Sequence, residues 1–207
     1  MTRAFLFASL ALLGGCISLL PKPPPPPQMF ALEAQNVERA AGDRIDAVIT
    51  VAQPTGERSI LGTDVIWRTG DSLAFVDQMQ WSNRAEFALQ SMLVETLSRQ
   101  ARFTAAARSG EARAEYEVRW NVLDFEVRED TMQARFVADV NLVQSPGRRI
   151  VASETFTAEA PVSGRSQTAA AQALARAARE GSARIGMFAA DAAAQAEAQA
   201  AAEASRR

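Results

Sequence analysis

Apolar and polar residues alternate along several stretches of the chain, which is the pattern of strands that bury one face. The first strong alternation buries Ile45, Ala47, Ile49 and Val51. A turn at 69–71 divides a later stretch into two short strands. The stretches with strand character are residues 29–34, 44–53, 62–77, 115–130, 131–144 and 148–160.

One of these stretches changes its apolar phase. Between residues 115 and 130 the apolar positions are first even and then odd: Tyr116, Val118, Trp120 and Val122, followed by Leu123, Phe125 and Val127. A shift of one residue turns every later side chain to the other face, unless the strand contains a bulge or bends. The sequence therefore predicts a bulge or bend near residue 122.

The apolar spacing becomes helical after Asn83, which we expect to cap a helix, with Glu86 as its capping-box partner. The helix should end near Ala101. Its buried face is predicted to hold Leu89, Met92, Leu93, Thr96 and Leu97.

A second, alanine-rich helix is predicted from Ser166 onward. Its apolar stripe contains Leu174, Ala178, Ile185 and Phe188. Beyond Ala189 only small, polar and charged residues follow, so we expect residues 190–207 to form a helical or disordered tail. The order strands, helix, strands, helix predicts an α+β domain, with a mostly antiparallel sheet and two helices packed on one face.

Composition excludes most catalytic chemistry. The chain has no histidine and a single cysteine, Cys16, and its one lysine, Lys22, lies among prolines. These counts exclude Ser-His and Cys-His nucleophiles, a phosphate-binding loop of the Walker type and a CxxC site. We therefore expect no enzyme, no metal site and no cofactor. A net charge of -2 without a basic cluster also argues against nucleic acid as a partner.

The start of the chain has the layout of an export signal. Arg3 precedes an apolar run from Ala4 to Leu13. The stretch Leu13–Gly14–Gly15–Cys16 resembles the lipobox of bacterial lipoproteins. This resemblance implies that residues 1–15 are removed and that Cys16 carries covalent lipid. An uncleaved anchor helix, and a secretory signal with an incidental cysteine, are the alternatives.

The residues after Cys16 indicate an address and a spacer. Ile17 follows the cysteine, and by the lipoprotein rule the absence of aspartate there implies the periplasmic face of the outer membrane. Pro21 to Pro27 predicts a polyproline II spacer that holds the domain roughly 20 Å from the bilayer. We assign 16–28 to the lipidated N-terminus and spacer, and 29–189 to the folded domain.

The folded part resembles the ABC-type transport auxiliary lipoprotein family, which includes proteins like paraquat-inducible protein C. Three segments carry the resemblance: a Leu-x-Thr-x-x-Ile-x-Arg stretch before a Trp-led helix, a long strand with an Asp-Phe step, and a Gly-Arg-x-x-x-Ala-x-x-x-Phe strand. The matching residues are Phe30, Leu61, Thr63, Ile66, Arg68, Trp81, Leu93, Leu97, Asp124, Phe125, Gly147, Arg148, Ala152 and Phe156.

The resemblance implies a non-catalytic subunit that docks on the MCE-domain protein of an ABC transporter of phospholipids or other hydrophobic compounds. It also implies a possible homo-oligomeric ring. The candidate partner-contact or fold-signature residues are Asp64, Arg68, Trp81 and Asp124. A periplasmic lipid-binding lipoprotein and an accessory lipoprotein of another envelope export machine are the alternative functions.

Overall fold

The structure is a computed structural model that describes residues 26–206. The predicted signal, Cys16 and most of the spacer lie outside the described residues. The elements are β1 (Gln28–Phe30), β2 (Ile45–Val51), β3 (Thr55–Gly56), α2 (Arg58–Leu61), β4 (Asp64–Thr69), β5 (Ser72–Trp81), α3 (Ala85–Gln100), β6 (Phe103–Arg108), β7 (Tyr116–Arg128), β8 (Gln133–Gln144), β9 (Arg149–Pro161) and α4 (Gln167–Ala204).

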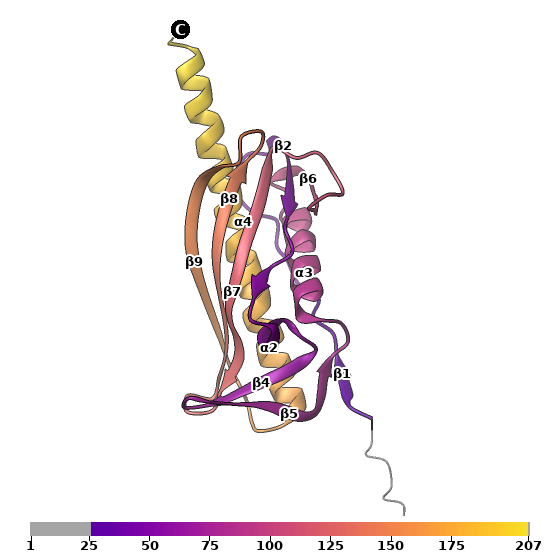
Figure 1. Cartoon of the computed structure of the whole chain (residues 1–207). Helices are drawn as coiled ribbons and strands as arrows, with labels where there is room; N and C mark the ends of the chain where they lie inside the picture. Colours follow the sequence, from indigo (N-terminus) through magenta and orange to yellow (C-terminus); the bar gives the residue numbers. More distant parts are fainter. Residues whose placement is uncertain (1–25, 207) are drawn as a thin grey trace, which may run out of the picture.

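Strand β7 is the centre of the sheet. Along one edge it pairs in turn with β2, β3 and β4, all parallel to it. Along the other edge it pairs over its whole length with the antiparallel strand β8, which in turn pairs with β9. Strands β6 and β5 extend the sheet beyond β2 and β4, and β1 joins β5 (Figure 1). The helices α3 and α4 pack together behind this sheet.

The α+β class is confirmed, but the prediction of a mostly antiparallel sheet is wrong. Within residues 26–206 the pairings β1–β5, β2–β6, β2–β7, β3–β7 and β4–β7 are parallel. The sheet is mixed because β2 and β4 both lie on β7, which is far away in the sequence, and because α3 lies in the crossover between β2 and the parallel strand β6. Alternation of apolar residues predicts a strand but carries no information on its direction.

The predicted bulge is confirmed. The register between β7 and β8 shifts between Val122 and Asp124, so the strand regains its inward phase at Phe125. The residue at the shift, Leu123, is exposed, although the sequence pattern placed it in the core. The bulge keeps the apolar side chains of both halves of β7 on the face that the helices cover.

Helix α3 has the buried face that the sequence predicts, but its cap is different. Asn83 accepts a hydrogen bond from the backbone N–H of Arg84, the next residue, and Glu86 forms an ion pair with the Arg84 side chain. The N–H of Ala85 donates instead to the carbonyl of Gly62, 2.8 Å away. A distant loop thus satisfies a helix donor, which local sequence rules do not predict.

Helix α4 begins after Ser166, whose hydroxyl accepts from the N–H of Ala169, and continues to Ala204. Its final turns extend beyond the sheet (Figure 1). Ala190, Ala193 and Ala196 are still buried, so alanine side chains cover the sheet beyond the large apolar residues. Within residues 26–206, no helix combines the length and hydropathy that a membrane span requires.

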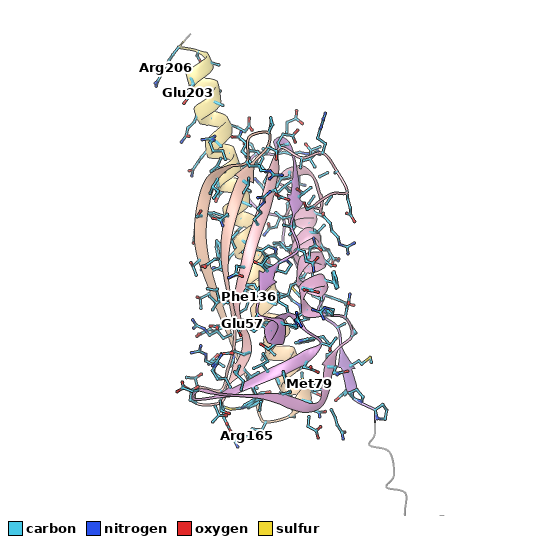
Figure 2. All side chains as sticks on the ribbon, viewed as in Figure 1. Glu57, Met79, Phe136, Arg165, Glu203 and Arg206 are labelled. Atoms are coloured by element: carbon cyan, nitrogen blue, oxygen red, sulfur yellow. The ribbon has the colours of Figure 1, made fainter. Side chains whose placement is uncertain are left out.

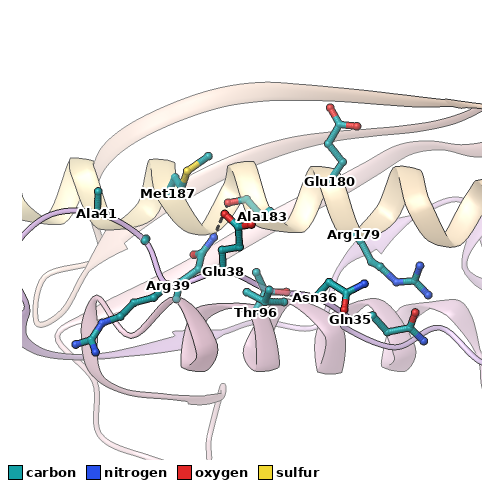
Figure 3. Close-up of a pocket in the computed structure, with 13 residues that line it drawn as sticks. Gln35, Asn36, Glu38, Arg39, Ala41, Thr96, Arg179, Glu180, Ala183 and Met187 are labelled. Atoms are coloured by element: carbon teal, nitrogen blue, oxygen red, sulfur yellow. Dashed lines mark hydrogen bonds between the residues drawn. The ribbon is translucent and has the colours of Figure 1, made fainter.

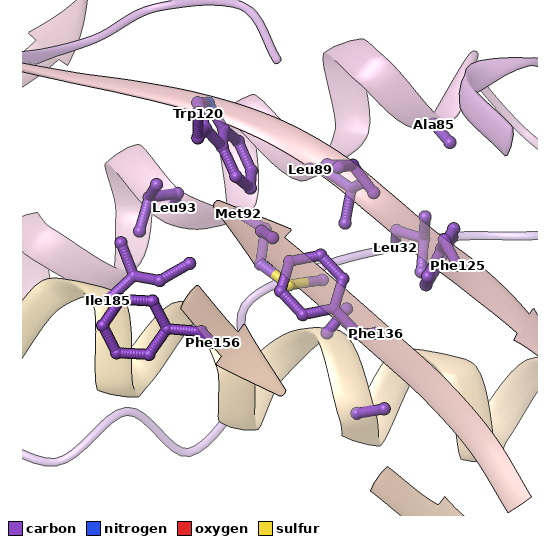
Figure 4. Packing of buried hydrophobic residues seen from close by; sticks show 14 of the residues in the cluster. Leu32, Ala85, Leu89, Met92, Leu93, Trp120, Phe125, Phe136, Phe156 and Ile185 are labelled. Atoms are coloured by element: carbon purple, nitrogen blue, oxygen red, sulfur yellow. The ribbon is translucent and has the colours of Figure 1, made fainter. Parts of the chain in front are cut away.

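The core between the helices and the sheet is closely packed (Figure 4). Phe136 lies at its centre, with tilted or edge contacts to Trp120 and Phe125. Helix α4 approaches this ring so closely that a Cβ atom added to Gly181 would lie 2.4 Å from Phe136. The absent side chain at residue 181 therefore sets the distance between helix and sheet.

We expect Gly181→Ala to lower the free energy of unfolding by about 1 kcal/mol or more, because the methyl group overlaps the Phe136 ring. Without that contact, alanine in a helix interior would stabilise by about 1 kcal/mol. Urea unfolding measures the difference. Gly164→Ala, in the loop before α4, is the control for an added methyl group without a clash, because nothing lies within 4 Å of its Cβ. A stabilised Gly181→Ala protein would contradict the packing.

Tyr116, at the start of β7, connects the sheet to the far part of α4. Its hydroxyl donates to Glu197 over 2.7 Å. Burial, followed by this bond and the negative charge of Glu197, raises the pKa of Tyr116. The folded state therefore favours the neutral phenol, and this stabilisation is lost as the pH rises through the raised pKa.

Tyr116 is the single tyrosine, so tyrosinate absorbance reports on it alone. We expect it to ionise well above pH 10 in the native chain and near pH 10 in urea. Wild type should also lose more of its free energy of unfolding above about pH 10 than Tyr116→Phe does. If the tyrosine titrates with the same midpoint pH in the native and the unfolded chain, the buried bond from Tyr116 to Glu197 is refuted.

Candidate functional site: a charged ladder across four strands

Charged side chains form a continuous row across β4, β7, β8 and β9, which we call the charged ladder. It consists of Arg68, Glu126, Arg128, Asp124, Arg135 and Glu159. Along β7 these residues occupy positions 124, 126 and 128, which alternate with the core residues Phe125 and Val127. The period of two places the ladder on the face of β7 opposite the core.

Glu126 holds the two strands β4 and β7 together. Its Oε1 accepts from Arg68 Nε at 2.6 Å and from Arg128 Nε at 3.3 Å, and its side chain has no exposed surface. The bond to Glu126 raises the pKa of Arg68 despite the opposing effect of partial burial. A carboxylate buried between two guanidinium groups is compensated in charge, so it acts as a brace between the strands, although its Oε2 has no hydrogen-bond partner among the described residues.

Asp124 continues the ladder toward β9. Its Oδ2 accepts from Arg135 Nε at 2.9 Å and lies 3.5 Å from Arg128 Nη2. Arg135 also donates to Glu159 over 2.6 Å, and these bonds raise its pKa. The three arginines and three carboxylates of the ladder neutralise one another.

The structure brings together two of the residues that the sequence singled out, Arg68 and Asp124. Asp64 lies nearby on β4, where Gln80 donates to it over 3.1 Å. Trp81 is buried and stacks on Phe125, with ring centroids 5.6 Å apart, so it packs in the core. The predicted lipidation site, Cys16, lies outside the described residues.

Sequence reasoning missed Glu126 and Arg135. The alternating charges at 124, 126 and 128 were visible and indicate one polar strand face. Their partners were not visible, because β4 and β7 are 58 positions apart at the Arg68–Glu126 bond. Within residues 26–206 no group of three or more His, Cys, Asp or Glu side chains could hold a metal ion.

A cleft lies between α3, α4 and the loop that joins β1 to β2 (Figure 3). It has a volume of about 430 Å³. Gln100 of α3 donates to the carbonyl of Ala183 on α4 at its base. Charged and amide side chains, including Glu38, Arg39 and Arg179, line part of the cleft, and apolar groups make up the larger part of its surface.

We expect Glu126→Gln to lower the free energy of unfolding by about 1–3 kcal/mol, because it removes the charge that two arginines share. Urea unfolding provides the measurement. Glu111→Gln is the matched control, because the Arg108–Glu111 pair is exposed and should contribute about 1 kcal/mol or less. Equal losses in the two variants would contradict the role of Glu126 as a brace.

Comparisons with known proteins agree with this fold. A crystal structure of a protein from Xanthomonas campestris superposes with a TM-score of 0.75 at 22% identity, covering 83% of this chain and 99% of that one. A crystal structure of an uncharacterised protein gives a TM-score of 0.64 at 17% identity, covering 79% and 99%. Both likenesses show the fold alone.

The family comparison is more informative. No curated protein matched the sequence. The family model described as "ABC-type transport auxiliary lipoprotein component" matches residues 30–186, which include every strand from β2 to β9 and about half of α4. The chain therefore belongs to the ABC-type transport auxiliary lipoprotein component family.

Proposed function

We propose that this auxiliary lipoprotein docks on the periplasmic MCE-domain component of an ABC-type system that moves phospholipid or other hydrophobic compounds. In this proposal Cys16 carries the lipid anchor and the chain occupies the periplasmic face of the outer membrane. Family membership supports the auxiliary role in transport, and the lipobox-like sequence followed by Ile17 supports the anchor and its address. The chain acts as an adaptor and catalyses no reaction.

The observation that carries the proposal is that the tether and the projecting helix lie at opposite ends of the domain. Strand β1, which follows the spacer, lies at one end of the molecule, and the last turns of α4 extend from the other end (Figure 1). An anchor on the β1 side turns the opposite end toward the periplasm. That end includes the β8–β9 turn and Ile150, which is 57% exposed. We infer that this end faces the transporter component.

The packing disfavours the alternative of a carrier that encloses a lipid. The Gly181–Phe136 approach leaves no room for a chain at that point of the interface between helix and sheet. Mass spectrometry of the purified chain distinguishes the two functions, because a carrier retains lipid. Assembly into a homo-oligomeric ring stays a prediction.

We expect a photo-crosslinker placed at Ile150 to capture the MCE-domain protein in envelope membranes. A crosslinker at exposed Phe87, on α3, serves as the surface control. Cys16→Ala should lower the yield strongly, because the unanchored chain loses the high local concentration that the membrane provides. Immunoblotting and mass spectrometry identify the captured protein. Capture of another envelope machine, or no MCE-domain partner at any position, would overturn the proposed docking.

A further inference from the structure

Exposed apolar side chains lie at the end of the domain where the chain enters from the spacer. Phe75 is 62% exposed and Leu73 is 45% exposed, both on β5. We call these two residues the apolar tip. Met29 on β1 is 65% exposed at the same end, but it lies beside Gln80, further along β5. Large apolar side chains that stay in water on a strand hairpin indicate a surface that another phase or molecule covers.

Strand pairing places Leu73 and Phe75 on one face of the β4–β5 hairpin. Phe75 pairs with Ile66 and Leu73 pairs with Arg68, and directly paired residues share a face. Ile66 and Arg68 pair in turn with Glu126 and Arg128 of β7. The charged ladder therefore fixes the hairpin that carries the tip to the centre of the sheet.

The tether enters beside this hairpin. Gln28, the first residue of β1, pairs with Met79 of β5 in the strand that carries the tip. Only 12 positions separate Gln28 from Cys16, a reach of roughly 37 Å at about 3.1 Å per residue. A chain lipidated at Cys16 keeps Gln28, at the end of the domain that carries the tip, within that distance of the bilayer. At such short range the effective concentration is in the millimolar range, so a weak contact suffices.

We propose that the apolar tip rests in the headgroup region of the membrane that carries the lipid anchor, as a second point of attachment. This inference depends on the anchor at Cys16 but not on docking to an MCE-domain protein. The acyl chains that a lipobox cysteine carries anchor the protein stably by themselves, so the contact at the tip sets how the domain lies on the membrane. The domain would then rest on the membrane surface and would not stand roughly 20 Å away from it.

The chemistry of the hairpin defines the kind of surface. Asp71 and Asp77 are exposed beside the tip, and Arg165, which lines the same hollow as Phe75, is paired with Glu129. The charge beside the tip therefore does not favour anionic lipid, and the contact is apolar.

Among the described residues, the outer edge of β5 from Ser72 to Gln78 has no partner strand. The carbonyl of Asp77 in this stretch accepts from Gln167. The other N–H and C=O groups of the open edge need water or headgroups, which limits the tip to the interface. A zwitterionic surface fits these features.

The opposite end of the molecule provides an internal control. In Figure 2, Met79 and Arg165 lie at the end with β1, whereas Glu203 and Arg206 lie at the far end. Ile150 begins β9 on the side of that far end and is 57% exposed, close to the value for Phe75. The two positions match in chemistry and exposure and differ in their place relative to the tether.

The test uses the full acylated chain in phosphatidylcholine vesicles. Acylation occupies the single native thiol, so Phe75→Cys or Ile150→Cys provides one site for an environment-sensitive NBD label. We expect nitroxide-bearing lipids to quench the label at 75 several-fold more than the label at 150. We also expect Leu73→Asp to reduce quenching at 75, and anionic lipid not to increase it.

Chains that float with the vesicles are anchored. If their labels at 75 and 150 are quenched equally and weakly, the tip does not contact the membrane, and a spacer that holds the domain away from the bilayer is supported. The membrane contact would also be overturned if the label at position 75 leaves water only after the MCE-domain protein is added. That result would assign the tip to a protein interface. If the chains do not float with the vesicles, both the lipid anchor at Cys16 and this proposal are wrong. Strong quenching at 75 without capture of an MCE-domain protein would count against the proposed docking alone.

Discussion

The fold depends on the pairing of β7 with strands from both halves of the chain. One edge of β7 receives β2, β3 and β4 in succession, and the other edge receives β8. A strand this long can stay apolar on the helix side only if its phase is corrected, and the bulge between Val122 and Asp124 provides that correction. Without the bulge, Phe125 would turn outward and Glu126 would face the core. The position of the hairpin and the burial of the core therefore depend on one irregular step in one strand.

Two kinds of close contact then fix the layers. Small residues bring α4 to the sheet, most clearly where Gly181 meets Phe136. On the other face, the charged ladder joins β4 to β7 through Arg68 and Glu126. Van der Waals packing sets the distance between helix and sheet, whereas the charge pairs select a partner strand and its register. The second role is directional, because a guanidinium and a carboxylate must meet at defined positions.

This arrangement gives the domain two different ends. The end that follows the spacer holds β1 and the β4–β5 hairpin, with Met29, Leu73 and Phe75 in the open. The other end holds the β8–β9 turn and the projecting turns of α4. The proposed adaptor role requires such an asymmetry, because one end would stay at the membrane while the other reaches a partner. The β4–β5 hairpin links the charged ladder to that asymmetry, since Arg68 pairs with Leu73 on one side and with Arg128 on the other.

The sequence by itself determined where most strands and both long helices lie, which face of each is buried, and that β7 must bend. These properties follow from the local alternation of apolar residues, and local periods survive in any tertiary context. It did not determine strand direction, the short elements β3, α2 and β6, or the helix donor satisfied by Gly62. It identified Arg68 and Asp124 as residues of interest but not Glu126, their shared neighbour. Those features depend on which distant segments meet. Two partners are needed for a parallel strand pair, for a helix N–H that bonds to a distant carbonyl, and for a buried ion pair. Only the tertiary structure brings the partners together.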